Sequence, residues 1–102
     1  MRTSKYANDS KRMAFREYLF TQKKKTTALG YMSSLSKESF VSEIAERKFH
    51  IKDIFDIQDM ETLRALYKEV VKDERNILGH SRYSAALNFY IAYLEWNKIM
   101  QK

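Results

Sequence analysis

The feature that most restricts the fold of this chain is the absence of proline together with only two glycines in 102 residues. Proline and glycine form most tight turns of hairpins and sandwiches, because proline fixes the backbone angle φ and glycine adopts positive φ without strain. A β-rich fold of this length needs many such turns, whereas helices joined by short polar connections need few. The chain is therefore predicted to be all-α.

The composition supports a folded core in a single domain. Hydrophobic residues make up 44% of the chain and aromatic residues 14%, which is more than disordered segments contain. A chain of 102 residues has the length of one ordinary domain. Because there is no cysteine, disulfides and thiolate zinc sites are excluded. No signal peptide and no apolar run of bilayer length is found, so a cytoplasmic setting is expected.

Apolar residues recur at intervals of three and four along four parts of the chain, which is the pattern of helices with one buried face. The predicted helices run from Asn8, Asp9 or Ser10 to Gln22, from Thr26 or Thr27 to Arg47, from Asp59 to about Arg75, and from about Ser81 to Ile99. We therefore predict a compact orthogonal bundle of four or five short helices around one core. Residues 1–9 are polar and are expected to be flexible.

Small polar residues are expected to cap or interrupt these helices. Thr26 or Thr27 is the expected N-cap of the second helix, and Asp59 is that of the third. Serines weaken a helix, so the second helix is predicted to break near Ser36. The dense apolar cluster that follows predicts a packed connection with a helical turn around Ile54.

The two glycines fall at different kinds of position. Gly30 lies inside the second predicted helix and costs it about 1 kcal/mol relative to alanine. Either another helix packs closely there or a phosphate does, and close helix packing is the commoner explanation. Gly79 and Ser81 are expected to form the entry to the last helix, with Ser81 as its cap.

The net charge of +6 is concentrated at one end of the chain. Residues 1–25 carry eight basic side chains against two acidic ones, whereas residues 26–102 carry eleven of each. A localised basic region favours a polyanionic partner, and nucleic acid fits better than a membrane because no strongly amphipathic basic helix accompanies it. A solvated N-terminal region explains the same charge equally well.

The sequence lacks a catalytic or cofactor-binding pattern. His50 and His80 lie thirty residues apart and do not have metal-ligand spacing. Gly30 and Gly79 are isolated and do not form a phosphate loop. His80 and Ser81 are adjacent, which rarely orients an imidazole onto its neighbour's hydroxyl. We expect no metal, no cofactor and no catalysis by this chain alone.

The segment Leu78–Tyr90, LGHSRYSAALNFY, resembles the late catalytic box of tyrosine recombinases, in which a leucine-glycine-histidine-serine stretch precedes a helix and a nucleophilic tyrosine. That family also needs a histidine-x-x-arginine element upstream, an earlier arginine and a lysine-bearing hairpin. Residues 1–77 supply no such set, and the chain is too short for that catalytic domain. Tyr90 and Tyr93 are therefore interpreted as residues of a helix face.

A second resemblance covers most of the chain. Its segments are FREYL at Phe15–Leu19, TTALGYMSSL at Thr26–Leu35, IFDIQDMETLRALYKEV at Ile54–Val70 and GHSRYSAALNFYIAYLE at Gly79–Glu95. Their order is similar to small all-α N-terminal modules of bacterial restriction endonucleases, including HNH-type enzymes, which in turn resemble the SAM-like core-binding domains of phage integrases. The resemblance implies a DNA-associated module of a restriction or DNA-recombination protein, whose catalytic domain lies elsewhere in a larger polypeptide.

Two helix starts become candidate DNA contacts under this resemblance. The first group is Lys23, Lys24, Lys25, Thr26 and Thr27. Cations, hydroxyls and the free N–H groups of a helix start together suit a phosphate. In the second group, a loop position for His80 and a cap role for Ser81 are the commoner explanations, so Arg82 is the better contact candidate. Arg12 and Arg16 share a face of the first helix and would extend the same surface.

The leading prediction is thus a non-catalytic DNA-binding module that contacts the phosphate backbone. The alternative is a protein-interaction or dimerisation module. Its candidate surface is a stripe on the last helix formed by Phe89, Tyr93, Trp96 and Met100. A last helix that is buried nearly all round explains the same stripe.

Overall fold

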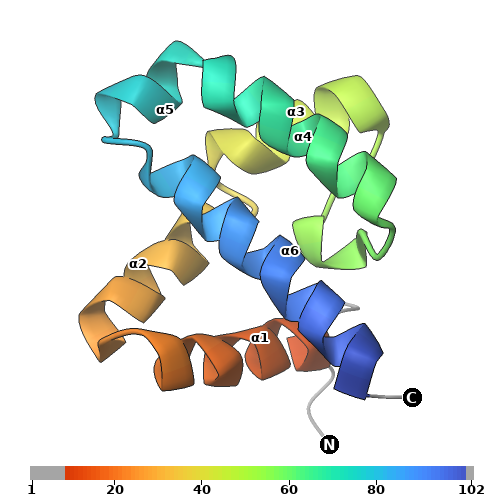
Figure 1. Cartoon of the computed structure of the whole chain (residues 1–102). Helices are drawn as coiled ribbons and strands as arrows, with labels where there is room; N and C mark the ends of the chain where they lie inside the picture. The colour runs from red at the N-terminus through yellow and green to blue at the C-terminus, as the bar shows by residue number, and fades with distance from the viewer. Residues whose placement is uncertain (1–8, 101–102) are drawn as a thin grey trace, which may run out of the picture.

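Helices and short connections make up the described part of the chain, residues 9–100 of the computed structural model, and no strand occurs within it (Figure 1). The elements are α1 (Asp9–Gln22), α2 (Lys25–Ser34), α3 (Phe40–Phe49), the 3-10 turn η1 (Ile54–Asp56), α4 (Met60–Lys72), α5 (Glu74–Leu78) and α6 (Arg82–Met100). The predicted all-α class is confirmed. Of the segment 1–9 that is predicted to be flexible, Asp9 begins α1 and residues 1–8 lie outside the described part. Within that part, no helix combines the length and the apolar character needed to cross a membrane.

Most of the predicted helix ends are confirmed. α1 ends at Gln22, and the predicted break near Ser36 falls between α2 and α3. The predicted turn at Ile54 is η1. The Asp59 carboxylate accepts a hydrogen bond of 2.9 Å from the N–H of Thr62, as its predicted cap role requires.

The predicted third helix is wrong at its end, because α4 stops at Lys72 and the separate helix α5 follows. Asp73 has an extended backbone (φ −75°, ψ 133°), and its carboxylate accepts a hydrogen bond of 2.8 Å from the N–H of Arg75. Such an acceptor starts a new helix because it satisfies one of the amides that a helix start leaves free. The described residues therefore contain five helices of ten or more residues and the five-residue α5.

α6 is the central helix and crosses the molecule diagonally (Figure 1). It contacts α1 and α2 on one side and α4 and α5 on the other. Its buried apolar residues repeat at intervals of three and four, as predicted: Ala86, Leu87, Tyr90, Ile91 and Leu94. The core around them includes Phe15 and Leu19 of α1 and Leu63 and Leu66 of α4.

Tyr90 joins three elements in the middle of this core. Its ring centroid lies 5.2 Å from that of Phe15 in α1 and 5.2 Å from that of Phe55 in η1, each with the rings edge-on. The Tyr90 hydroxyl donates a hydrogen bond of 3.1 Å to the carbonyl of Ile57 and accepts one of 3.3 Å from the Gln58 amide. Because Tyr90 is only 1% exposed, these partners replace the water that its hydroxyl has lost.

The two glycines have different surroundings, and neither has a positive φ. A Cβ added at Gly79 would lie 2.7 Å from the Tyr83 ring, so a larger residue collides with that ring. The Tyr83 ring is held in place by Phe40, at a centroid distance of 4.5 Å. A Cβ added at Gly30 meets nothing within 4 Å, so the predicted close packing of another helix at Gly30 is wrong.

Alanine substitutions at the two glycines should change the free energy of unfolding in opposite directions. Gly79→Ala is expected to lower it by about 1–3 kcal/mol, because the Tyr83 ring must leave its place beside Phe40. Gly30→Ala is expected to raise it by about 0.5–1 kcal/mol, because alanine favours the helix and fills open space. Urea titration followed by circular dichroism measures both, and equal effects of the two substitutions would contradict the packing described.

Candidate nucleic-acid interface

The basic run between the first two helices forms an exposed corner of the molecule. Lys23, Lys24, Lys25, Thr26 and Thr27 are all exposed, and they are called the lysine corner below. The chain turns here from α1 into α2, at the lower left of Figure 1. Lys24 is the extended residue of the turn (φ −60°, ψ 152°), while the N–H of Lys23 still bonds to the carbonyl of Leu19 at 2.8 Å. The first predicted contact group is thus contiguous on the surface.

The start of α2 has no side-chain cap. Lys24 occupies the N-cap position, and no side chain accepts a hydrogen bond there. The predicted cap at Thr26 or Thr27 is wrong, because both residues lie within the first turn of α2 and not before it. The N-cap residues that do accept such a bond in α3, α4 and α5 are Ser39, Asp59 and Asp73. The free amides of α2 and the positive end of its dipole therefore meet at an open surface.

Ion pairs neutralise much of the charge on the other helices. Examples are Arg47 with Glu43 at 2.6 Å, Lys48 with Glu69 at 3.2 Å, and Arg64 with Glu95 at 3.0 Å. Hydrogen bonds from Arg47 and Lys48 are the main cause of the lowered pKa values of Glu43 and Glu69. None of the ion pairs found between residues 9 and 100 includes a lysine of the lysine corner. The first turn of α2 also has no acidic residue, so the charge of the corner stays uncompensated.

One lysine of the corner is anchored to the central helix. The Lys23 ammonium lies 5.2 Å from the centroid of the Phe89 ring, which is a cation–π distance. Phe89 is itself half-buried and packs on Tyr31 of α2, at a centroid distance of 5.4 Å. This contact fixes the corner against α6 and leaves Lys24 and Lys25 to the solvent.

The turn between α5 and α6 holds the second predicted contact group. His80 and Ser81 are exposed and have positive φ values of 56° and 62°, so the chain reverses sharply before Arg82. The predicted cap role of Ser81 is wrong, because a left-handed residue lacks the extended backbone of an N-cap. Instead Asn76, which is 2% exposed, accepts a hydrogen bond of 3.0 Å from the N–H of Ser84 and donates one of 3.1 Å to its hydroxyl.

Asn76 is a structural residue that helical periodicity does not reveal. It belongs to α5, and its partner Ser84 lies eight residues further on, inside α6. The sequence gives little indication of this buried role, because an asparagine close to a glycine usually marks an exposed turn. Here the Asn76 amide is buried and its hydrogen bonds to Ser84 join α5 to α6. These bonds hold the turn that carries His80 and Arg82 in place.

Arg82 is exposed and is held by its neighbour Tyr83. Its guanidinium donates a hydrogen bond of 2.8 Å to the Tyr83 hydroxyl and lies 4.8 Å from the centroid of that ring. It borders an open cavity of about 270 Å³, whose other polar lining residues are Ser33, Ser34, Ser36, Glu38 and Ser39. Arg82 therefore lies near the end of α2, about 15 Å along that helix from the lysine corner.

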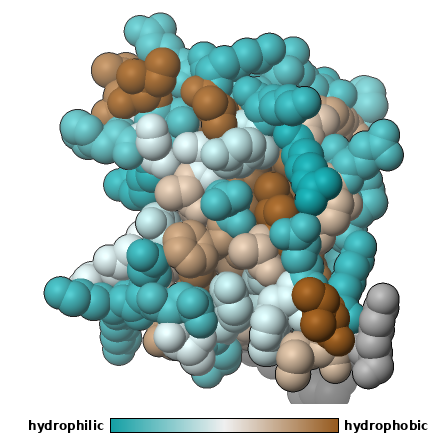
Figure 2. Space-filling view, in the orientation of Figure 1, coloured by the Kyte–Doolittle hydropathy of each residue, from teal (hydrophilic) through white to brown (hydrophobic). Residues whose placement is uncertain are grey.

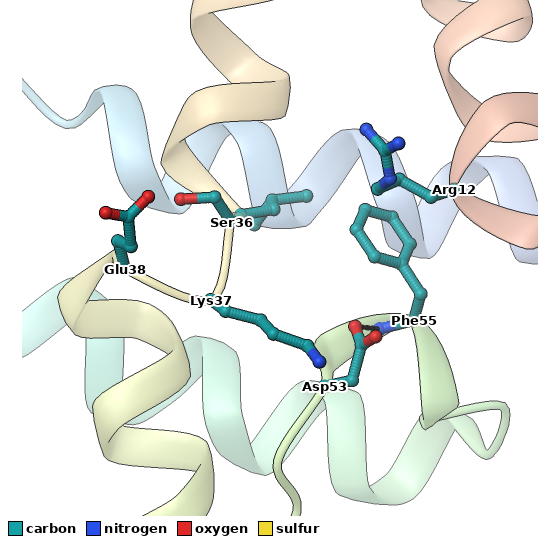
Figure 3. Close-up of a pocket in the computed structure, with 7 residues that line it drawn as sticks. Arg12, Ser36, Lys37, Glu38, Asp53 and Phe55 are labelled. Carbon is teal, nitrogen blue, oxygen red and sulfur yellow. Dashed lines mark hydrogen bonds between the residues drawn. The ribbon is translucent and has the colours of Figure 1, made fainter. Parts of the chain in front are cut away.

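Arg12 is partly buried and faces a different cavity. This cavity has a volume of about 340 Å³, and the residues around it include Ser36, Lys37, Glu38, Asp53 and Phe55. Figure 3 shows Arg12 reaching in from α1, while the Lys37 side chain extends toward Asp53. The carboxylates of Glu38 and Asp53 make this cavity a poor phosphate site. Arg12 also lies about 16 Å along α1 from Lys23, so the structure does not bring it to the lysine corner.

Arg16 is also partly buried. Its guanidinium lies 5.4 Å from the centroid of the Phe20 ring on its own helix. Its Nε atom is buried and has no hydrogen-bond partner. The predicted contact face of Arg12 and Arg16 is thus turned largely toward neighbouring side chains.

The predicted aromatic stripe on the last helix is covered in its first half and exposed in its second. Phe89 packs on α2, and the Tyr93 ring lies 5.1 Å from that of Tyr18 in α1. By contrast, Trp96 is 47% exposed and Met100 is 64% exposed. Only the C-terminal part of the stripe remains available to a partner.

The tyrosine of the recombinase-like segment is a core residue, as its helical spacing predicts. Burial, together with the nearby charge of Asp53, raises the pKa of the Tyr90 hydroxyl above its ordinary value. The hydroxyl is bound to the main-chain carbonyl of Ile57 in the interior. Among residues 9–100, no three acidic or histidine side chains are arranged to hold a metal ion.

Comparison with known proteins gives no match: no protein-family model, no curated protein and no solved structure matches this chain. The resemblance to restriction-enzyme modules therefore stays a prediction.

Replacing Asn76 should destabilise the protein, whereas replacing Ser81 should not. Asn76→Ala removes the acceptor for the first turn of α6 and leaves the Ser84 amide without a partner, at an expected cost of about 1–3 kcal/mol. Ser81→Ala changes an exposed hydroxyl and should stay within about 0.5 kcal/mol of the wild type. Thermal and urea unfolding measure both. A larger loss in Ser81→Ala than in Asn76→Ala would restore Ser81 as the cap.

Proposed function

We propose that this chain is a non-catalytic DNA-binding module that contacts phosphates at the lysine corner. The observation that carries the proposal is the meeting of three exposed lysines with the uncapped start of α2. Lysine ammonium groups, threonine hydroxyls and free amides all donate hydrogen bonds, and the helix dipole adds to the positive potential there. Such a set of donors suits the phosphate oxygens of a DNA backbone.

A second contact at the α5–α6 turn is part of the proposal. Figure 2 shows that the molecule is hollowed on one side, between α5 and the corner where α1 meets α2. The lysine corner borders this hollow below, and the turn that carries His80 and Arg82 borders it above. Arg82 is the stronger phosphate ligand, since its planar guanidinium presents several N–H donors that match phosphate oxygens. DNA lying across the hollow would meet both segments. Arg12 and Arg16 are not part of this proposed contact.

We also propose a SAM-like helix arrangement for this chain and a place in a restriction or integrase-like protein. A SAM-like arrangement agrees with an all-α bundle and with the order of the four segments similar to restriction-enzyme modules. In that case the module belongs to a restriction or integrase-like protein, and a catalytic domain in the same polypeptide supplies the chemistry. The residues of the present chain then hold and orient the DNA.

Salt-dependent DNA binding tests the lysine corner. The variant Lys23→Ala/Lys24→Ala/Lys25→Ala should bind a short duplex more weakly than the wild type. It should also lower the slope of log Kd against log salt by about 2–3, because each lost phosphate contact removes about one unit. Fluorescence anisotropy of a labelled duplex at several salt concentrations measures both quantities.

The matched control removes the same charge elsewhere. In Lys52→Ala/Lys68→Ala/Lys98→Ala, three exposed lysines outside the corner are lost, and the slope is expected to stay near that of the wild type. If the two triple variants lose affinity equally, binding reflects net charge alone and the proposed contact is wrong. DNA binding without salt dependence would be equally incompatible with it.

The exposed end of α6 favours a second candidate function, a protein-interaction or dimerisation module. Trp96, Ile99 and Met100 are 47%, 71% and 64% exposed. Figure 2 shows apolar side chains, in brown, near the C-terminal end of α6. Exposed aromatic and aliphatic side chains that lie together are typical of protein contact surfaces.

Sedimentation velocity tests self-association through this surface. A dimerising chain should show a sedimentation coefficient that rises with concentration, and Ile99→Ser/Met100→Ser should remove the rise because it makes the contact polar. A wild-type monomer at micromolar and at high concentration would exclude dimerisation through α6.

A further inference from the structure

A groove between α1 and α6 combines exposed aromatic rings with polar side chains. Its wider part is a cavity of about 600 Å³, lined mainly by Glu17, Tyr18, Thr21 and Gln22 of α1 and by Tyr93 and Trp96 of α6. A narrower cavity of about 190 Å³ continues it, because Ala14 and Tyr93 line both. At the other end the groove reaches Gln22, the residue directly before the lysine corner.

Three aromatic rings line the wider part of this groove and contact one another. The Tyr18 centroid lies 5.1 Å from that of Tyr93 and 5.8 Å from that of Trp96, and the last two centroids are 6.4 Å apart. Trp96 is nevertheless 47% exposed, so nearly half of its surface meets solvent beside the two tyrosines. A flat ligand stacked on the indole would remove this apolar surface from water.

The charge next to the groove distinguishes between possible flat ligands. Tyr18 precedes Lys23 by five residues, which is about 7.5 Å along the helix axis and about the rise of two stacked nucleotides. A strand with phosphates at the lysine corner therefore reaches Tyr18 and Trp96 with its bases. A nucleic acid uses both the rings and the cations, since binding of single strands combines base stacking with a basic surface.

Polar side chains at the rim match the edges of bases. The Glu17 carboxylate and the Gln22 side-chain carbonyl accept hydrogen bonds, which the amino groups of cytosine, adenine and guanine donate. The Thr21 hydroxyl donates a bond of 2.6 Å to the Tyr18 carbonyl and accepts one of 3.2 Å from the Gln22 amide. These bonds hold Thr21 and Gln22 in place beside the rings.

We infer that Trp96, supported by Tyr18 and Tyr93, stacks against an unpaired base of single-stranded DNA bound at the lysine corner. The inference rests on the proposed function, because the corner supplies the phosphate contacts. Bases of a duplex are stacked within the helix, so only a single strand, a loop or a frayed end presents a free base face. The module therefore prefers single-stranded to duplex DNA.

Trp96 is the only tryptophan of the chain, so its fluorescence reports stacking directly. A mixed-sequence single strand of about ten nucleotides is expected to quench it, and an abasic strand of equal length should leave it nearly unchanged. Trp96→Ala should weaken single-strand binding by about 5- to 100-fold and leave duplex binding nearly unchanged, as measured by anisotropy of labelled DNA. Equal affinity of the wild type for the intact and the abasic strand would overturn the inference.

Two further variants separate stacking from folding. Val71→Ala changes an apolar residue of α4 that is 42% exposed and does not line the groove, and it should bind like the wild type. Trp96→Phe keeps a ring and should retain most of the single-strand affinity. If Trp96→Ala binds single strands as tightly as the wild type while the lysine-corner variant does not, stacking is wrong and the proposed function stands. If the wild type binds neither form of DNA, both are wrong.

Discussion

Burial of the Tyr90 hydroxyl is the interaction on which the arrangement of the helices depends. A hydroxyl that leaves water needs a hydrogen-bond partner. Tyr90 has one because the connection before α4 folds as η1 and places the Ile57 carbonyl 3.1 Å away. The same ring packs edge-on against Phe15, so one residue fixes both η1 and α1 against α6. The groove between α1 and α6, and the lysine corner at the end of α1, follow from this contact.

Local and periodic signals account for the parts of the fold that could be predicted. Long apolar stripes such as that of α6 are visible because burial of one helix face requires intervals of three and four. The Asp59 cap acts on a residue three positions later, so it too is visible in the sequence. α5 is too short to show a period, and Asn76 acts through Ser84 in the next helix. These features depend on how helices pack, which a single sequence does not display.

The candidate site likewise has residues that could be predicted from the sequence and residues whose contacts could not. The lysine run could be found by counting charges, because its members are neighbours in the chain. The contact between Tyr18 and Trp96 joins the first helix to the last and depends on their packing. Helical spacing also places Arg12 and Arg16 on one face of α1, yet it cannot tell which groups that face meets. In the structure, Arg12 faces the α2–α3 connection and η1, and Arg16 lies over the ring of Phe20.

The turn between α5 and α6 separates the residues that maintain the fold from those that face the solvent. The buried Asn76 side chain accepts a hydrogen bond from the N–H of Ser84 across the turn, and the Tyr83 ring packs on Gly79. His80 and Arg82 are exposed, as are Lys24 and Lys25 at the lysine corner, whereas Lys23 contacts the Phe89 ring. Substitutions at such positions have small effects on stability. Lys24 and Lys25 can therefore be replaced with little loss of stability, whereas Lys23 is restricted by its contact with Phe89, and His80 and Ser81 by their positive φ values.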